Sequence, residues 1–144
     1  MWFARVFALF PAGDDTLYGI GGLVASVLDE IRVQSCLIAL GGIVGTNLRY
    51  AVGAAAGDAL AVTLAVNTVG SFALGVVLAG AYGTDLHLPV SVGFCGAFTT
   101  FSSFSFQTVS LWERGERARA AVNAVANLLV SLLAFAGAWL LVSH

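Results

Sequence analysis

Charged residues divide the sequence into long uncharged runs. Arg49 is the single charged residue between Val33 and Gly57, and the run from Ala59 to Thr84 has none. Two further uncharged runs extend from Leu88 to Trp112 and from Ala120 to Ser143. Each run is long enough to cross a hydrocarbon layer of about 30 Å as a helix. The pattern predicts an all-α membrane protein with four transmembrane helices joined by short links.

The N-terminal residues 1–32 fit this pattern less well. Met1 to Phe10 is too short for a span, and Thr16 to Leu28 is an apolar run that ends at Asp29 and Glu30. Such a run favours an interfacial or poorly ordered extension, and an extra helix at the edge of the bundle is the alternative. We therefore expect residues 1–32 to form an N-terminal extension and residues 33–144 to form the transmembrane domain.

Composition and charge agree with a protein whose main partner is the lipid bilayer. Hydrophobic residues make up 59% of the chain and charged residues 10%, against roughly 25% charged in a soluble domain. The net charge of −2 gives no sign of a nucleic-acid partner. The arginines are nearly balanced between the two predicted sides of the membrane, so the chain is compatible with insertion in both orientations. Four short helices enclose a pathway poorly, which favours an oligomer.

Residues 94–107 place Gly, Thr, Ser and Phe in the middle of the third uncharged run. The Gly-Ala-Phe-Thr-Thr stretch, residues 96–100, favours a break in the third helix near mid-bilayer. Freed backbone groups are tolerated there only where protein or a water-filled cavity satisfies them. Phe101 and Phe104, three residues apart, share a helix face beside Ser102 and Ser103, and aromatic ring edges can contact a small anion. Packing in the core or against lipid is the alternative for the two rings.

Polar residues in the other runs are further candidates. Asn67 lies near the centre of the second run, where its amide can hold an anion or link two helices. Arg49 either reaches the membrane interface or supplies a fixed positive charge to a vestibule. The last candidates are Asn123, Asn127 and Ser131, whose spacing puts them on one face of the fourth helix. That stripe is either a contact between helices or a polar track for an ion.

Other function classes have less support. A small four-helix multidrug or ion transporter coupled to protons needs an intramembrane carboxylate, and none of the four runs contains Asp or Glu. A non-conducting membrane scaffold would leave the polar stripe and the Thr-Thr-Phe-Ser stretch without a purpose. His87 and His144 have no neighbouring nucleophile or metal ligand, so we do not expect an enzyme.

Three motifs occur in order on three successive runs. They are Gly41-Gly42-x-x-Gly45-x-x-Leu48-Arg49-Tyr50, Val66-Asn67-x-x-Gly70-Ser71-Phe72 and Gly93-Phe94-x-Gly96-x-x-Thr99-Thr100-Phe101-Ser102-x-Phe104-Ser105. Over about residues 37 to 140 the chain resembles the Fluc fluoride-channel family, also called CrcB. The resemblance implies a multi-pass protein of the cell membrane that exports fluoride passively and protects against fluoride toxicity.

The resemblance also implies an assembly and a cofactor. Family members are antiparallel, dual-topology homodimers, or heterodimers of two homologues, with two fluoride pores. A structural Na⁺ at the dimer centre is held by backbone carbonyls that correspond to Gly96 and Thr99 here, and freed carbonyls suit a hard cation.

Residue roles follow from the same resemblance. The pore residues of the family correspond to Phe101, Phe104, Asn67, Ser102, Ser103, Asn123, Asn127 and Ser131, with Arg49 in the vestibule. Two positions depart from the family pattern, because a tyrosine is common at Asn123 and a glutamate at Gln107. Both changes keep hydrogen bonding and bear on rate or gating.

Overall fold

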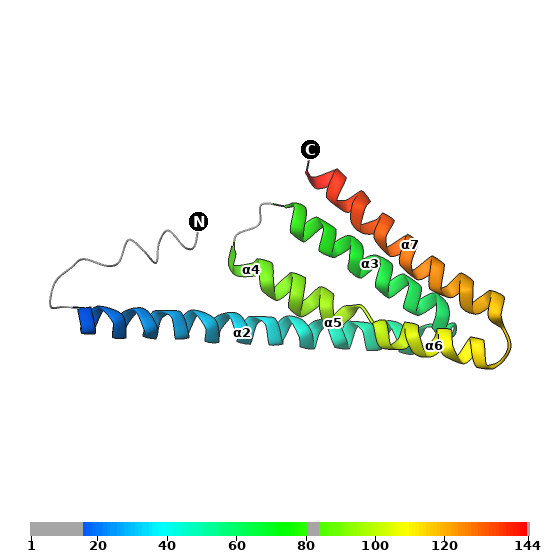
Figure 1. Cartoon of the computed structure of the whole chain (residues 1–144), viewed down its shortest axis with the longest axis horizontal. Coiled ribbons are helices and arrows are strands. Elements are labelled where there is room, and N and C mark those ends of the chain that lie inside the picture. Colours follow the sequence, from blue (N-terminus) through cyan, green and yellow to red (C-terminus); the bar gives the residue numbers. More distant parts are fainter. Residues whose placement is uncertain (1–15, 81–83, 144) are drawn as a thin grey trace. The chain divides into compact units, whose positions relative to one another are not determined.

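The computed structural model describes residues 16–80 and 84–143, and every element in them is helical. The chain divides into two compact units, residues 1–35 and 36–144, and the helices of the second unit carry the candidate residues. Figure 1 shows these helices in chain order. The prediction of an all-helical protein is confirmed for the described residues.

Helix α2, Thr16–Ala55, covers the first run from Val33 as far as Ala55, with Arg49 inside it. Residues 1–15 of the expected extension lie outside the described residues. From Thr16 onward the extension is helical and belongs to the same helix as Val33 to Ala55. The predicted boundary at residue 33 therefore does not coincide with a helix end.

Helices α3, Ala59–Ala79, and α7, Arg117–Val142, pack side by side. Asp58 caps α3, because its carboxylate accepts from the N–H groups of Leu60 at 3.0 Å and Ala61 at 3.4 Å. A Cβ on Gly75 would lie 2.5 Å from the carbonyl oxygen of Phe135, so the two backbones approach closely. Both helices are long and apolar enough to cross a membrane.

The third uncharged run consists of several short helices. Helix α4, Thr84–Leu88, continues into the π-helix η1, Pro89–Cys95, and then into α5, Gly96–Phe98. Thr99 and Thr100 have extended backbones, with ψ of 158° and 106°. Helix α6, Phe101–Glu113, follows, and the Thr100 hydroxyl caps it by accepting from the Ser103 N–H at 3.2 Å.

Glycines let α2 pass close to this run. A Cβ on Gly45 would lie 2.5 Å from the carbonyl oxygen of Phe94. A Cβ on Gly93 would lie 2.5 Å from the carbonyl oxygen of Ile38. Gly41 faces the Pro89 carbonyl in the same way. The Gly41 and Gly45 pair is thus a backbone contact between helices, as the small-residue spacing suggests.

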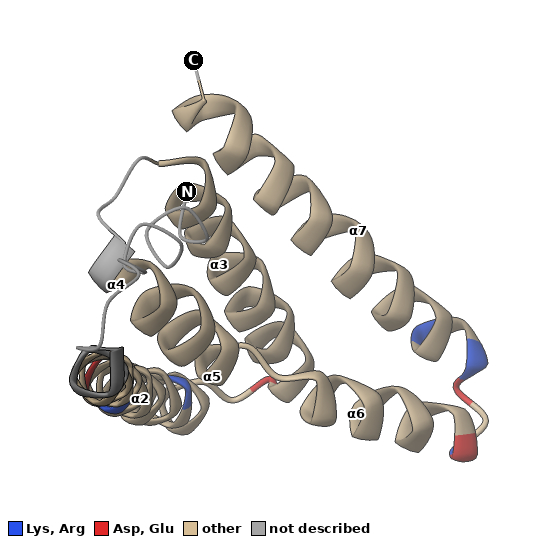
Figure 2. Ribbon diagram, turned by 60° about the vertical axis from the view of Figure 1, so that its left-hand side comes forward, with Lys and Arg blue, Asp and Glu red and all other residues tan. Residues whose placement is uncertain are grey.

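A glycine also makes the sharp link between α6 and α7. Gly115 has a φ of +80°, which is the left-handed region that favours glycine. Its N–H donates to the Trp112 carbonyl at 3.0 Å, and the N–H of Glu116 donates to that of Leu111 at 2.9 Å. These two bonds end α6 in a Schellman motif. Figure 2 shows that acidic and basic residues gather at this link.

The described residues of the second unit bury polar groups and expose apolar ones. The buried polar residues are Thr63, Ser91, Thr100, Asn123 and Asn127. Large apolar side chains are exposed along α7, including Val122, Leu129, Leu133, Leu140 and Leu141. This distribution is the reverse of that in a soluble protein and suits a protein surrounded by lipid.

Candidate functional site

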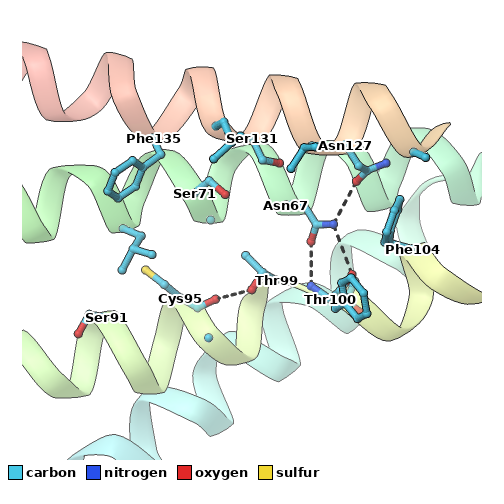
Figure 3. Close-up of a pocket in the computed structure, with 17 residues that line it drawn as sticks. Asn67, Ser71, Ser91, Cys95, Thr99, Thr100, Phe104, Asn127, Ser131 and Phe135 are labelled. Atoms are coloured by element: carbon cyan, nitrogen blue, oxygen red, sulfur yellow. Dashed lines mark hydrogen bonds between the residues drawn. The ribbon is translucent and has the colours of Figure 1, made fainter. Parts of the chain in front are cut away.

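The site is built around the two extended residues between α5 and α6. Asn67, on α3, accepts the Thr100 N–H at 2.8 Å through Oδ1. The Nδ2 of Asn67 donates to the Thr100 carbonyl oxygen at 3.3 Å, and Figure 3 shows both hydrogen bonds. One amide side chain therefore satisfies both backbone groups of a buried residue that lacks helical partners.

Arg49 contacts the neighbouring peptide group. Its Nη1 donates to the Thr99 carbonyl oxygen at 3.1 Å. The Thr99 N–H and hydroxyl both donate to the Cys95 carbonyl, at 3.1 Å and 3.0 Å. The guanidinium thus brings a positive charge to the end of α5, next to the residue that Asn67 holds.

A groove of about 800 Å³ opens beside these residues. It is mostly apolar, and Figure 3 shows the polar side chains of Asn67, Asn127 and Ser131 at its wall. Phe101 and Phe104 also line it, with ring centroids 5.6 Å apart and ring planes inclined by 52°. Phe101 is 79% exposed in the isolated chain, so one side of its ring has no neighbour from this subunit.

The polar stripe on α7 is divided between the groove and the packed interior. Asn127 and Ser131 line the groove, and the buried Ser131 Oγ has no hydrogen-bond partner. Asn123 is 8% exposed and does not line the groove. Its Nδ2 donates to the Thr108 hydroxyl on α6 at 2.9 Å, and its Oδ1 accepts from Asn127 at 3.1 Å.

Thr100 also lines a second cavity of about 280 Å³. Arg49, Thr63, Ser103 and Gln107 are among the residues that line it. Gln107 Nε2 donates to the carbonyl oxygen of Ala59 at 3.0 Å and to the Thr63 hydroxyl at 2.9 Å. The cavity therefore joins the start of α3, α6 and the charged end of Arg49.

Ser102 lies apart from both cavities. Its side chain is exposed, and its Oγ lies 3.3 Å from the Thr100 Oγ1. Its neighbour Ser103 lies in the smaller cavity and accepts from the Thr100 hydroxyl at 3.0 Å. Both serine hydroxyls thus contact the Thr100 hydroxyl, and of the two only Ser103 lines one of these cavities.

Comparison with known proteins identifies the family. The family model described as CrcB-like protein, Camphor Resistance (CrcB), matches residues 36–139. This chain belongs to the CrcB family. The matched region is almost the whole second unit and includes every candidate residue.

Curated relatives of the CrcB chain carry a functional name. A protein of Haloarcula marismortui named Fluoride-specific ion channel FluC 2 is 48% identical over 105 residues, which cover 72% of this chain and 88% of the relative. A protein of Chelativorans sp. named Fluoride-specific ion channel FluC is 39% identical over 115 residues, or 72% and 92% of the two chains. The corresponding protein of Thermus thermophilus is 41% identical over 111 residues, or 70% and 89%.

The carbonyl groups expected to hold Na⁺ in a CrcB protein differ in their surroundings. In a continuous helix the Gly96 carbonyl would accept the Thr100 N–H, but that N–H donates to Asn67. A Cβ on Gly96 would meet nothing within 4 Å, so this side of the chain is open. The Thr99 carbonyl already accepts from Arg49. The described residues contain no group of three His, Cys, Asp or Glu side chains suited to a metal.

Sequence reasoning missed two residues of this CrcB site. Thr100 lines both cavities and contacts Asn67, although the sequence marks it only as part of a possible helix break. Thr108 is the acceptor for Asn123, and its hydroxyl donates to the Phe104 carbonyl at 2.8 Å. A threonine one turn after Phe104 carries no signal of its own, because such bonds within a helix are common.

Proposed function

We propose that this protein is a channel subunit that carries fluoride passively across the cell membrane and so protects the cell against fluoride toxicity. The observation that carries the proposal is the groove beside the extended Thr99 and Thr100, which is lined by two phenylalanine rings, the amides of Asn67 and Asn127, and the Ser131 hydroxyl. The relatives named fluoride-specific ion channels support the choice of ion.

The chemistry of the groove suits a small anion. Fluoride is strongly hydrated, so a pathway must replace its water with donors of similar strength. The Ser131 hydroxyl has no protein partner, and the edges of Phe101 and Phe104 are weakly positive. The guanidinium of Arg49 adds a positive field that attracts anions and discourages cations.

The pathway is completed by a second subunit. The groove is open in one subunit, and Phe101 lacks a neighbour on its exposed face. An antiparallel, dual-topology dimer of four-pass subunits would cover that face and give two equivalent pores. The partner is either a second copy or a homologue, and the numerals 1 and 2 in the names of some relatives are compatible with paired homologues.

A structural Na⁺ at the dimer centre is part of the proposal. The Gly96 carbonyl, freed from its helical donor, is a suitable ligand for a hard cation. The Thr99 carbonyl would complete the set while also accepting from Arg49. Each subunit then supplies two backbone oxygens, and the ion supplies positive charge between the two pores.

Efflux from liposomes tests the function directly. Purified protein is reconstituted into vesicles loaded with potassium fluoride, and release is followed with a fluoride electrode after valinomycin is added to balance charge. Fast release without a proton gradient is expected, and release of chloride from matched vesicles is expected to be far slower. A requirement for a proton gradient would replace the channel with a coupled transporter, and absence of flux would favour a scaffold.

A further inference from the structure

A chain of side-chain hydrogen bonds joins the two ends of the Phe101–Phe104 turn through α3 and α7. Asn67 Nδ2 donates to Asn127 Oδ1 at 3.1 Å, and Asn127 Nδ2 donates to Asn123 Oδ1, also at 3.1 Å. Asn123 Nδ2 donates to the Thr108 hydroxyl at 2.9 Å, and this hydroxyl donates to the Phe104 carbonyl. At the other end, Asn67 Oδ1 accepts the Thr100 N–H.

Both ends of this chain have a fixed hydrogen-bond polarity. The Thr100 N–H can only donate, and the Phe104 carbonyl can only accept. Each amide between them has one donating and one accepting end, and Asn127 Nδ2 also donates to the Asn123 backbone carbonyl at 3.2 Å. These backbone groups together permit a single orientation for all three amides. Turning any one of them over would place two donors or two acceptors against each other.

Burial makes that orientation costly to disturb. Asn123 and Asn127 are 8% and 6% exposed, so neither amide can exchange a lost partner for bulk water. Thr108 fixes the far end of the chain. Its hydroxyl donates its proton to the Phe104 carbonyl, so toward Asn123 it can only accept a hydrogen bond. Without it, the Asn123 amide loses the contact that keeps its oxygen toward Asn127.

We propose that Thr108 and Asn123 are positioning residues that fix the amide orientation of Asn127 and Asn67 toward the permeating anion. This inference rests on the proposed function, because it names the residues that orient the hydrogen-bond donors of the same groove. Both N–H groups of Asn67 are engaged, one by Thr100 O and one by Asn127 Oδ1. A fluoride ion in the groove takes the acceptor place of Asn127 Oδ1, which requires that Asn67 keep its nitrogen toward that wall.

The test combines flux with a direct view of the amides. In Thr108→Val the hydroxyl is replaced by a methyl group, and Thr108→Ser restores it. Thr108→Val is expected to slow fluoride efflux about tenfold, because one amide donor of the groove would no longer be held toward the anion. Thr108→Ser is expected to stay near the rate of the unsubstituted protein. Thr46→Val, an exposed site on α2, is the matched control and is expected to change nothing.

Side-chain amide spectra separate positioning from loss of packing. The asparagines of the sequence are Asn47, Asn67, Asn123 and Asn127, so ¹⁵N-asparagine labelling gives a short set of NH₂ signals. Thr108→Val is expected to shift the signals of Asn123, Asn127 and Asn67 and to leave that of Asn47, which donates to Ile43 O on α2. Fluoride is expected to shift the Asn67 signal in the unsubstituted protein and less in Thr108→Val.

Two results would overturn the inference. One is a Thr108→Val spectrum in which only the Asn123 signal shifts. The other is a fluoride efflux rate for Thr108→Val that equals the rate for Thr108→Ser. If Thr108→Val does not fold, Asn123→Leu removes the same link from the other side and is read in the same way. Failure of the proposed function would appear separately, as absence of fluoride flux in the unsubstituted protein with the amide shifts intact.

Discussion

At the scale of single residues, Asn67 supplies the backbone hydrogen bonds that a continuous helix would otherwise give to Thr100. Its amide satisfies the N–H and the carbonyl of Thr100 at 2.8 Å and 3.3 Å, so a buried residue with extended backbone keeps both hydrogen bonds. The sequence left two interpretations of this amide open, a ligand for an anion and a link between two helices. In this structure both donors of Asn67 contact protein acceptors, Thr100 O and Asn127 Oδ1.

The two phenylalanines give the first prediction at this scale. Phe101→Ile and Phe104→Ile remove an aromatic edge from the groove and keep an apolar side chain. Loss of that contact is expected to slow fluoride release about tenfold without dissociating the proposed dimer. Liposome efflux measures the rate, and size-exclusion chromatography in detergent measures the assembly.

Phe106→Ile is the matched control. Phe106 lies on the same helix, is 75% exposed and is absent from both cavities. Its replacement is expected to leave the fluoride release rate within about twofold of the unsubstituted protein, since substitutions at exposed positions outside a functional site are nearly neutral. Equal rates for all three variants would remove Phe101 and Phe104 from the pore.

At the scale of elements, close backbone contacts hold the interrupted run in place. The Thr100 hydroxyl caps α6, and α2 approaches the run through glycines. Gly70 on α3 faces the Thr99 side chain, so a larger residue there would push against the extended segment itself. These contacts fix where α5 ends and α6 begins.

Gly45 and Gly42 provide a paired prediction at this scale. In Gly45→Ala the new Cβ would lie 2.5 Å from the Phe94 carbonyl oxygen, whereas in Gly42→Ala its nearest neighbour would be 3.9 Å away. Gly45→Ala is expected to destabilise the protein by about 1–3 kcal/mol, and Gly42→Ala to be neutral or slightly stabilising. Thermal unfolding in detergent measures both, and similar melting temperatures would contradict this packing.

At the scale of the whole molecule, the distribution of side chains fits a protein that meets lipid and a partner subunit. The described helices expose large apolar residues and bury amides and hydroxyls. Charged residues gather where α6 ends and α7 begins. There Arg119 pairs with Glu116, and the Arg117 guanidinium lies 5.1 Å from the centre of the Trp112 ring. The aromatic and basic side chains suit the membrane interface.

Near balance of arginines predicts insertion in both orientations. Reporters fused after His144, one active in the cytoplasm and one active outside it, are both expected to give signal. Adding two or three lysines at that end is expected to bias the termini toward the cytoplasm and to remove the second signal. Signal from a single reporter in the unmodified chain would contradict dual topology.

Sodium removal tests the centre of the proposed dimer. A ligand that binds only the folded state stabilises it by about 2.7 kcal/mol at a hundredfold excess over its Kd. The melting temperature in detergent is therefore expected to fall when N-methylglucamine replaces sodium at constant ionic strength. Potassium serves as a second control, and identical melting in all three salts would argue against a structural sodium ion.

The charge pattern predicted the helical class and the approximate limits of α3 and α7, because charged residues are excluded from lipid wherever they have no partner. The link at Asp58 and the fourth helix follow it closely. The start of α2 at Thr16 and the π-helix from Pro89 to Cys95 could not be predicted, because neither leaves a distinct periodicity.

Spacing was less informative for the site. The i, i+4, i+8 stripe correctly puts three polar residues on one side of α7, but it does not say what each one meets. Asn123 turns toward Thr108 on α6, while Asn127 and Ser131 reach the groove. Such a difference depends on where the neighbouring helix begins, which local sequence does not encode.

The two extended residues also set an angular phase. Each residue in an α-helix turns the chain by about 100°, so the length of the non-helical segment decides which way the side chains of α6 point. One alanine inserted between Thr100 and Phe101 would rotate both rings away from the groove and carry Gln107 and Thr108 with them. An insertion beside Gly115 would instead lengthen a surface link. The same single residue should therefore abolish conduction at one place and be tolerated at the other.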